Sequence, residues 1–207
     1  MAFSKNKVFV LTITTILASC YAFTTTSTSS KLHINITDTD LVSSTCNKTL
    51  YVQLCESSLR SDPRSESADP RGLAAIALDQ SLAKGVDTIA HIDNLRSESA
   101  SDASKALVIS RLSDCTAAYS DALENLRDSA QALDDESYET LRSLVSAAMT
   151  DSETCEDGFM EIEGYSSPLT EQNQCFSRLC SNFLAIVTLL DWLIGLYFCI
   201  AIINKIY

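Results

Sequence analysis

The sequence lacks the residue patterns that most enzymes and cofactor-binding proteins carry. It has no glycine-rich phosphate loop, no serine nucleophile elbow and no pair of histidines at metal-binding spacing. Its two histidines, His33 and His91, are isolated, and no cysteine pair has a histidine nearby at zinc-knuckle spacing. We therefore expect no catalytic residue, no metal site and no cofactor, and the sequence predicts a protein that is not an enzyme.

Basic residues are also scarce. Lys and Arg number 15 against 27 Asp and Glu, which gives a formal net charge of −12. Loss of residues 1–22 would remove two positive charges, Lys5 and Lys7, and leave −14. A chain this acidic repels phosphate backbones, so nucleic acid is excluded as a partner, and a basic protein partner is favoured. The alternative is that the acidic surface only keeps the domain soluble.

The amino-terminal end is hydrophobic and resembles an export signal. A positively charged start precedes an apolar run, Val8 to Leu17, and Ala22 closes a small-residue cleavage site. The run is too short for a membrane anchor. We expect residues 1–22 to be a signal peptide and residues 23–37, rich in Thr and Ser, to be a flexible leader.

The carboxyl-terminal end is hydrophobic for a different reason. Phe183 to Ile203 contains one charge, Asp191, and is long enough to span a membrane, although a charge near mid-span is costly in lipid. Residues 191–207 are therefore interpreted in three ways: an apolar extension packed on the domain, a membrane anchor, or an altered gene end that replaced the usual stop, which we favour. A membrane is a partner only in the second case.

Export permits disulfide bonds. Without Cys20 seven cysteines remain, so at least one thiol is free or pairs with another chain. Cys46 and Cys55 flank eight residues, and a bond between them would close a small helical hairpin; the alternative is a buried pair of free thiols. Two glycosylation sequons lie in this region, at Asn35 and Asn47.

Apolar residues recur at steps of three and four in four stretches, which predicts four amphipathic helices. We expect them at residues 72–96, 102–133, 136–161 and 170–190. Asp134 and Asp135 should open the third helix, and Thr170 with Gln172 or Asn173 should cap the fourth. Short connections and the absence of a useful strand pattern favour an all-α, up-down-up-down four-helix bundle.

Each helix has a stripe of residues that should be buried. The stripes are Leu78, Leu82, Val86 and Ile89; then Leu112, Cys115, Tyr119, Ala122, Leu126, Ser129 and Leu133; then Tyr138, Leu141, Val145, Ala148, Ser152, Cys155, Phe159 and Ile162; and finally Cys175, Leu179, Phe183, Ile186 and Leu190.

The second and third helices each carry a cysteine on the buried stripe. If these helices are antiparallel, Cys115 and Cys155 can meet inside the bundle and bond. At about 100° per residue from an inward-facing Cys115, three carboxylates lie on the outer side of the second helix: Asp121, Glu124 and Asp128, at about 240°, 180° and 220°. They form either a solvated helix face or a surface for a partner.

Several short motifs, taken in order, resemble the plant invertase and pectin methylesterase inhibitor family. They are the Cys46 and Cys55 pair, SADPRGL from Ser67, DCTAAY from Asp114, DAL from Asp121, SAAMT from Ser146, TCEDGF from Thr154 and SNFLAI from Ser181. The resemblance covers about residues 38–190, which we take as the domain. It implies a secreted four-helix bundle with an amino-terminal helical hairpin and disulfides Cys46–Cys55 and Cys115–Cys155.

The resemblance also implies a function, the reversible inhibition of pectin methylesterase in the cell wall, or apoplast. The middle helices would cover the substrate cleft of the enzyme, and the implied contacts are Asp121, Glu124, Asp128, Thr154 and Asp157.

Two alternatives remain open. The first is inhibition of a cell-wall or vacuolar acid invertase. Some invertase inhibitors carry Pro-Lys-Phe between the second and third helices, where this chain reads DESYE from Asp135. The second is a non-inhibitory extracellular or membrane-tethered binding module.

Overall fold

The computed structural model describes residues 40–206, with side chains described except at position 103 and positions 193–206. The chain divides into two compact units, and Thr39–Ile194 forms the unit that carries the helical domain. The expected signal peptide, the leader and the Asn35 sequon lie outside the described residues. The elements are, in order, α2 (Leu41–Cys46), α3 (Val52–Arg60), η1 (Pro63–Glu66), α4 (Pro70–Ser99), η2 (Ala103–Lys105), α5 (Ala106–Asp134), α6 (Tyr138–Met160) and α7 (Thr170–Ile206).

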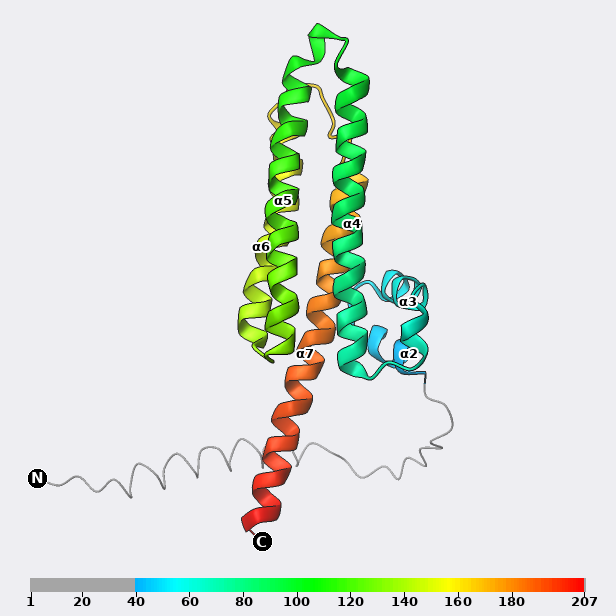
Figure 1. Cartoon of the computed structure of the whole chain (residues 1–207), viewed down its shortest axis with the longest axis vertical. Coiled ribbons are helices and arrows are strands. Elements are labelled where there is room, and N and C mark those ends of the chain that lie inside the picture. The colour runs from blue at the N-terminus through cyan, green and yellow to red at the C-terminus, as the bar shows by residue number, and fades with distance from the viewer. Residues whose placement is uncertain (1–39, 207) are drawn as a thin grey trace, which may run out of the picture. The chain divides into compact units, whose positions relative to one another are not determined.

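The long helices α4, α5, α6 and α7 lie side by side in the domain, and α2 and α3 lie beside α4 (Figure 1). Their connections are short, so consecutive helices run in opposite directions. The structure therefore confirms the predicted all-α, up-down-up-down bundle with an amino-terminal helical hairpin.

Aspartates set where the helices begin. Asp69 accepts a hydrogen bond from the Gly72 amide at 2.7 Å, and Pro70 occupies the first helical position of α4, where its missing N–H costs nothing. Asp40 caps α2 in the same way through the Val42 amide. These carboxylates satisfy amides that have no partner within the helix.

The hairpin is closed by one disulfide and fixed to α7 by polar contacts. Cys46 and Cys55 are bonded, with their Cα atoms 5.5 Å apart. Asn182 of α7 donates to the Tyr51 carbonyl at 3.1 Å and accepts from the Tyr51 amide at 3.3 Å. The Arg178 guanidinium lies 5.4 Å from the centre of the Tyr51 ring. The turn before α3 is therefore held against the bundle.

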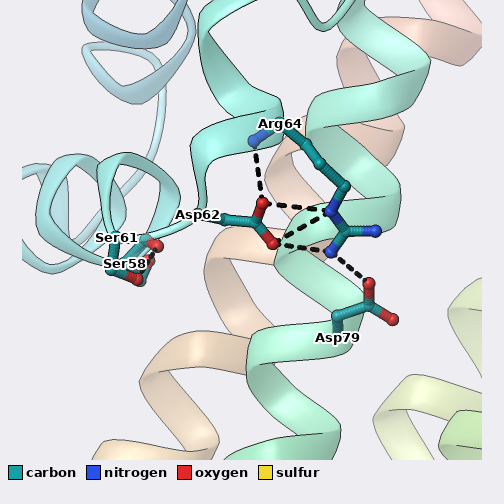
Figure 2. A network of polar contacts seen from close by, with 5 residues as sticks. All are labelled: Ser58, Ser61, Asp62, Arg64 and Asp79. Atoms are coloured by element: carbon teal, nitrogen blue, oxygen red, sulfur yellow. Dashed lines mark hydrogen bonds and ion pairs between the residues drawn. The ribbon is translucent and has the colours of Figure 1, made fainter.

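The connector between α3 and α4 contains structure that we did not predict. It includes η1, and Figure 2 shows the Arg64 side chain reaching Asp62 and Asp79 of α4, each at 2.6 Å. The hydrogen bonds from Arg64 lower the pKa of Asp62. These exposed pairs add little stability but fix the direction in which the chain enters α4.

The predicted core of α5 and α6 is confirmed. Every residue of the expected α5 stripe is buried, and so is the expected α6 stripe up to Phe159. Ile162 is only half-buried because it lies beyond Met160, where α6 ends. The three-and-four spacing therefore identified the faces by which these two helices pack.

The predicted stripe of α4 is confirmed at Leu78 and is wrong beyond that residue. Val86 is 51% exposed, and Leu82 and Ile89 are only half-buried. The buried stripe instead runs through small residues between two aliphatic ends: Leu78, Ser81, Gly85, Thr88 and Ile92. The Ser81 and Thr88 hydroxyls donate to carbonyls of their own helix, at 2.9 and 2.8 Å, which lets these polar side chains be buried.

The predicted stripe of α7 is confirmed at Leu179, Phe183, Ile186 and Leu190, and only Cys175 was wrong. Cys175 is half-buried, whereas Phe176 and Cys180 are buried. Burial raises the pKa of the Cys180 thiol to about 12, so this thiol stays protonated and unreactive. Thr170 is the first helical residue rather than a cap, and Asn173 lies inside the bundle at 5% exposure.

The turn between α5 and α6 also differs from the prediction. Asp134 ends α5 and Asp135 caps it, so neither residue opens the next helix. Glu136 has φ +54°, the Ser137 amide donates to the Ala132 carbonyl at 2.8 Å, and the Glu136 amide donates to the Leu133 carbonyl at 3.3 Å. This is a Schellman ending with Glu at the position that usually holds Gly.

The last helix extends beyond the expected domain boundary. It continues as one helix to Ile206. Within the domain, Asp191 pairs with Arg142 of α6 at 3.0 Å. By length and composition Thr170–Trp192 would suffice to cross a membrane, and 44% of its apolar window is buried in the protein. The three interpretations of residues 191–207 remain predictions.

Candidate functional site: the α5–α6 face

A disulfide joins the two middle helices of the domain. Cys115 of α5 and Cys155 of α6 are bonded with Cα atoms 4.7 Å apart, and both are buried. Ala122 and Ala148, both fully buried, provide small side chains on the same stripes. The two predicted disulfides are thus confirmed. The bond prevents α5 and α6 from separating at this level, so residues on their outer surfaces keep a fixed arrangement.

A shallow groove of about 380 Å³ lies over this disulfide. The two cysteines, Ala118 and Gly158 contribute small or apolar surface to it, while Arg111 and several acidic residues add charge. The lining comprises Arg111, Asp114, Cys115, Ala118, Thr154, Cys155, Asp157, Gly158 and Glu161. The groove is open, three of its four charged residues are acidic, and its lining comes from α5, α6 and Glu161 just beyond α6.

Arg111 links the two helices at this groove. Its guanidinium pairs with Asp114 on its own helix at 3.3 Å and with Glu161 just beyond α6 at 2.6 Å. Both carboxylates are exposed, so the pairs contribute orientation more than stability. The groove retains more negative than positive charge.

The outward carboxylates of α5 lie where helical geometry predicted them. Asp121, Glu124 and Asp128 are all exposed. The pKa of Asp151 in α6 is raised, mainly by burial and secondly by the nearby negative charge of Asp121. The Asn125 amide donates to the Asp151 carboxylate at 3.4 Å. The acidic surface therefore continues across the α5–α6 seam.

Thr154 and Asp157 lie on the α6 side of the groove. Both are exposed and both line it, on either side of Cys155. The Thr154 hydroxyl donates to the Thr150 carbonyl at 2.9 Å, which fixes its rotamer. The structure thus brings Thr154, Asp157 and the Asp114 end of α5 together over the disulfide. No described contact joins Glu124 to this groove.

Sequence reasoning missed four residues of this surface: Asp114, Asn125, Asp151 and Glu161. A signal for Asp114 was present, because it precedes Asp121 by seven residues, the same spacing that separates Asp121 from Asp128. No comparable signal existed for Asp151, since its proximity to Asp121 depends on how the two helices are rotated against each other.

A buried polar network supports this face from behind. The Tyr119 hydroxyl donates to Asn173 of α7 at 2.8 Å, and Asn173 donates to Glu156 of α6 at 2.7 Å. Glu156 also accepts from Thr170 at 2.5 Å. Burial raises the pKa of Tyr119, which keeps its hydroxyl a donor. The network connects three helices and rigidifies the scaffold under the groove.

Within the described part of the chain, no three His, Cys, Asp or Glu side chains are placed to hold a metal ion. What the α5–α6 face offers is a slightly hollowed surface whose charged residues are mostly acidic.

Comparison with known proteins connects this sequence and fold to one group of plant proteins. Residues 40–186 match the family model described as plant invertase/pectin methylesterase inhibitor. The cell wall / vacuolar inhibitor of fructosidase 2 of Arabidopsis thaliana is 33% identical over 144 residues, which cover 69% of this chain and 78% of the relative. The pectinesterase inhibitor of Actinidia deliciosa is 32% identical over 150 residues, covering 72% and 79%. A crystal structure of a mutant pectin methylesterase inhibitor from Arabidopsis has the same fold, with a TM-score of 0.57, 21% identity and coverage of 71% and 95%.

Proposed function

Because the chain belongs to the plant invertase/pectin methylesterase inhibitor family, we propose that it is a protein inhibitor that reversibly covers the active-site cleft of pectin methylesterase. It performs no chemistry of its own and needs no cofactor. The observation that carries the proposal is the rigid acidic face of α5 and α6, stapled by Cys115–Cys155.

The rigidity of this face supports inhibition by occlusion. A surface already held by a disulfide and a buried polar network loses little conformational entropy on binding, which favours affinity. The face then excludes the polymeric substrate from the cleft of the enzyme. Release of the inhibitor restores activity, because no covalent bond forms.

The charge of this face supports a partner with a basic surface. Asp121, Glu124 and Asp128 are exposed and free to meet cationic side chains, while Thr154 and Asp157 offer a hydroxyl and a carboxylate at the groove. Charges at the rim of an interface accelerate association and make it sensitive to salt. We therefore expect inhibition to weaken as ionic strength rises.

Acid invertase is the second candidate target, and the names of three relatives favour it. One at 33% identity is named as an inhibitor of fructosidase, and two at 32% identity, from Platanus orientalis and Platanus acerifolia, are named putative invertase inhibitors. Against it stands the α5–α6 turn, where Asp135 to Ser137 and the first residues of α6 contain no Pro-Lys-Phe element. Pectin methylesterase therefore remains the first choice.

The test is a paired titration of the purified mature chain against a plant pectin methylesterase and a plant acid invertase. We expect inhibition of the first enzyme. Inhibition of invertase alone would reverse the order of the two targets, and inhibition of neither would leave a non-inhibitory binding module.

Variants locate the binding face. Replacing Asp121, Glu124 and Asp128 by Ala should weaken inhibition at least tenfold without changing the melting temperature, because all three are exposed. The matched control removes the same charge from α4 through exposed Asp87, Asp93 and Glu98, and should retain potency. Equal potency of the two triple variants would remove the α5–α6 patch from the proposal.

Location and boundaries belong to the same proposal. We infer that the mature protein begins after Ala22, is secreted to the apoplast and uses about residues 38–190 as its inhibitory domain, consistent with the family match over 40–186. Residues 191–207 have no counterpart in that match. Fractionation of tissue decides their role, since a membrane anchor would need detergent for release.

A further inference from the structure

The turn between α2 and α3 carries a glycosylation sequon, Asn47-Lys48-Thr49, that folding partly hides. Asn47 and Lys48 are exposed, but Thr49 is buried. The Thr49 hydroxyl donates to the Cys46 carbonyl at 2.8 Å, and the Thr49 amide donates to the same oxygen at 2.9 Å. In the closed hairpin the hydroxyl that completes the sequon is therefore engaged and inaccessible.

The backbone of the sequon is also folded back on α2. The Asn47 amide donates to the Ser43 carbonyl and the Lys48 amide to the Thr45 carbonyl, both at 3.0 Å. Asn47 itself has helical backbone angles, φ −60° and ψ −10°. Sugar transfer needs the asparagine amide and the threonine hydroxyl to enter one enzyme site together, which requires the tripeptide to open out. The helical turn prevents this.

The disulfide holds the sequon in this closed form. Cys46 is the residue directly before Asn47, and its bond to Cys55 fixes the end of α2 with the two Cα atoms 5.5 Å apart. While that bond is intact, Asn47 to Thr49 cannot extend without breaking the turn. While it is open, the short α2 helix, Leu41–Cys46, is too short to persist alone.

We propose that Asn47 accepts a glycan only before the Cys46–Cys55 bond forms, so that closing the hairpin ends glycosylation at this site. The inference rests on the proposed entry into the secretory pathway. A sugar added earlier is tolerated afterwards, because Asn47 remains exposed in the folded hairpin.

Both competing reactions involve ordinary secretory chemistry. In glycosylation, Asn47 Nδ2 attacks the anomeric carbon of a lipid-linked oligosaccharide; the bond from that carbon to the diphosphate oxygen breaks, the diphosphate leaves with the electron pair, and Nδ2 loses a proton to a base of the transferase. In hairpin closure, Cys46 and Cys55 transfer two electrons and two protons to the disulfide of a secretory oxidoreductase, which becomes a dithiol.

Glycosylation has to occur before the hairpin closes, so we expect partial occupancy. A growing chain gains about 5–20 residues per second, and Cys55 therefore follows Asn47 within about two seconds. Disulfide formation takes from seconds to hours. The sequon is therefore complete before the hairpin closes, and Asn47 can be glycosylated only in the interval that ends when the bond forms.

The experiment measures Asn47 occupancy by mass spectrometry on pulse-labelled full-length chains from secretory plant cells, so that later folding failure does not matter. Wild type is compared with Cys46→Ser/Cys55→Ser, and the matched control Cys115→Ser/Cys155→Ser removes the other disulfide while leaving the hairpin intact. Asn47→Gln marks the chain that carries no glycan at this position.

We expect wild type to be less than half occupied, the hairpin variant to gain at least twofold, and the control to stay at the wild-type level. A brief treatment of wild type with a membrane-permeable reductant should raise occupancy in the same way. Equal occupancy in all variants, or an equal gain in both disulfide variants, would overturn the proposal. Failure to enter the secretory pathway is a separate outcome, because it would show as chains that retain residues 1–22.

Discussion

Gly85 of α4 is the position where the packing of this bundle makes the sharpest prediction. A methyl group built on Gly85 would lie 2.8 Å from Leu123 Cδ2 of α5 and 3.2 Å from Phe176 Cε2 of α7. Both distances are shorter than carbon atoms normally approach, and Gly85, Leu123 and Phe176 are all buried. The absence of a side chain at Gly85 therefore lets three helices meet.

Two effects oppose each other when Gly85 is replaced by Ala. Alanine favours the helix over glycine by about 1 kcal/mol. Forcing a methyl group into a packed core costs about 1–3 kcal/mol, because side chains must leave their preferred rotamers. We expect the second effect to win, with a net loss of about 1 kcal/mol for Gly85→Ala and a larger loss for Gly85→Val.

Gly158 of α6 provides the matched control. A methyl group there would meet only Arg111 Cδ, at an ordinary contact distance of 3.7 Å. Gly158→Ala should therefore stabilise the protein by about 0.5 kcal/mol, since it keeps the propensity gain near a helix end and has no steric cost.

Thermal unfolding measures the difference. A change of 1 kcal/mol shifts Tm by about 2–4 °C in a domain of this size. Gly85→Ala should lower Tm while Gly158→Ala raises it. If both variants raised Tm equally, the close meeting of α4, α5 and α7 at Gly85 would be wrong.

Three other perturbations have clear expected outcomes. Replacing Cys115 and Cys155 by Ser should lower the free energy of unfolding by about 4 kcal/mol, because the bond spans 40 residues. The loss should exceed that of the double variant that removes the hairpin disulfide. An unchanged Tm would show that the Cys115–Cys155 bond is absent. Burial and the charge of Asp121 raise the pKa of Asp151 in the folded protein. The stability that the protonated Asp151 carboxyl contributes is therefore lost as pH rises through this folded pKa. Asp151→Asn should raise Tm at pH 7 and not at pH 3, which calorimetry at both pH values would test. Glu136→Gly should stabilise by about 1 kcal/mol in chemical denaturation, because glycine adopts positive φ without strain, and a loss of stability would show that the ion pair of Glu136 outweighs that strain.

The helices and their disulfides were predictable because their signals are local or chemical. Steps of three and four identified the buried faces of α5 and α6, and a cysteine on each face predicted where the helices could be joined. The same logic failed on α4, where Val86 was chosen and Gly85 is buried. Large apolar residues identify a core position only where neighbouring helices leave room for a side chain. At Gly85 the helices pack so closely that no side chain fits.

The candidate site was predictable in part, for a related reason. The outward direction of Asp121, Glu124 and Asp128 follows from the rotation of one helix, which the sequence determines. The proximity of Asp151 to Asp121 depends on the register between two helices, which arises only from tertiary packing. Single-helix geometry therefore predicted the direction of the patch and could not predict its extent across the seam.

Core positions and exposed positions have separate roles in this bundle, which explains how one fold can serve two targets. A structure only 21% identical to this chain has the same fold, so the bundle tolerates extensive substitution while its packing pattern persists. Exposed positions such as Thr154 and Asp157 contribute little to that packing, and they are free to change with the partner. Target choice should therefore move with the α5–α6 surface and the turn at Glu136, and stability with the core. Exchanging the exposed α5–α6 residues for those of an invertase inhibitor should then change the enzyme inhibited while leaving the melting temperature within a few degrees.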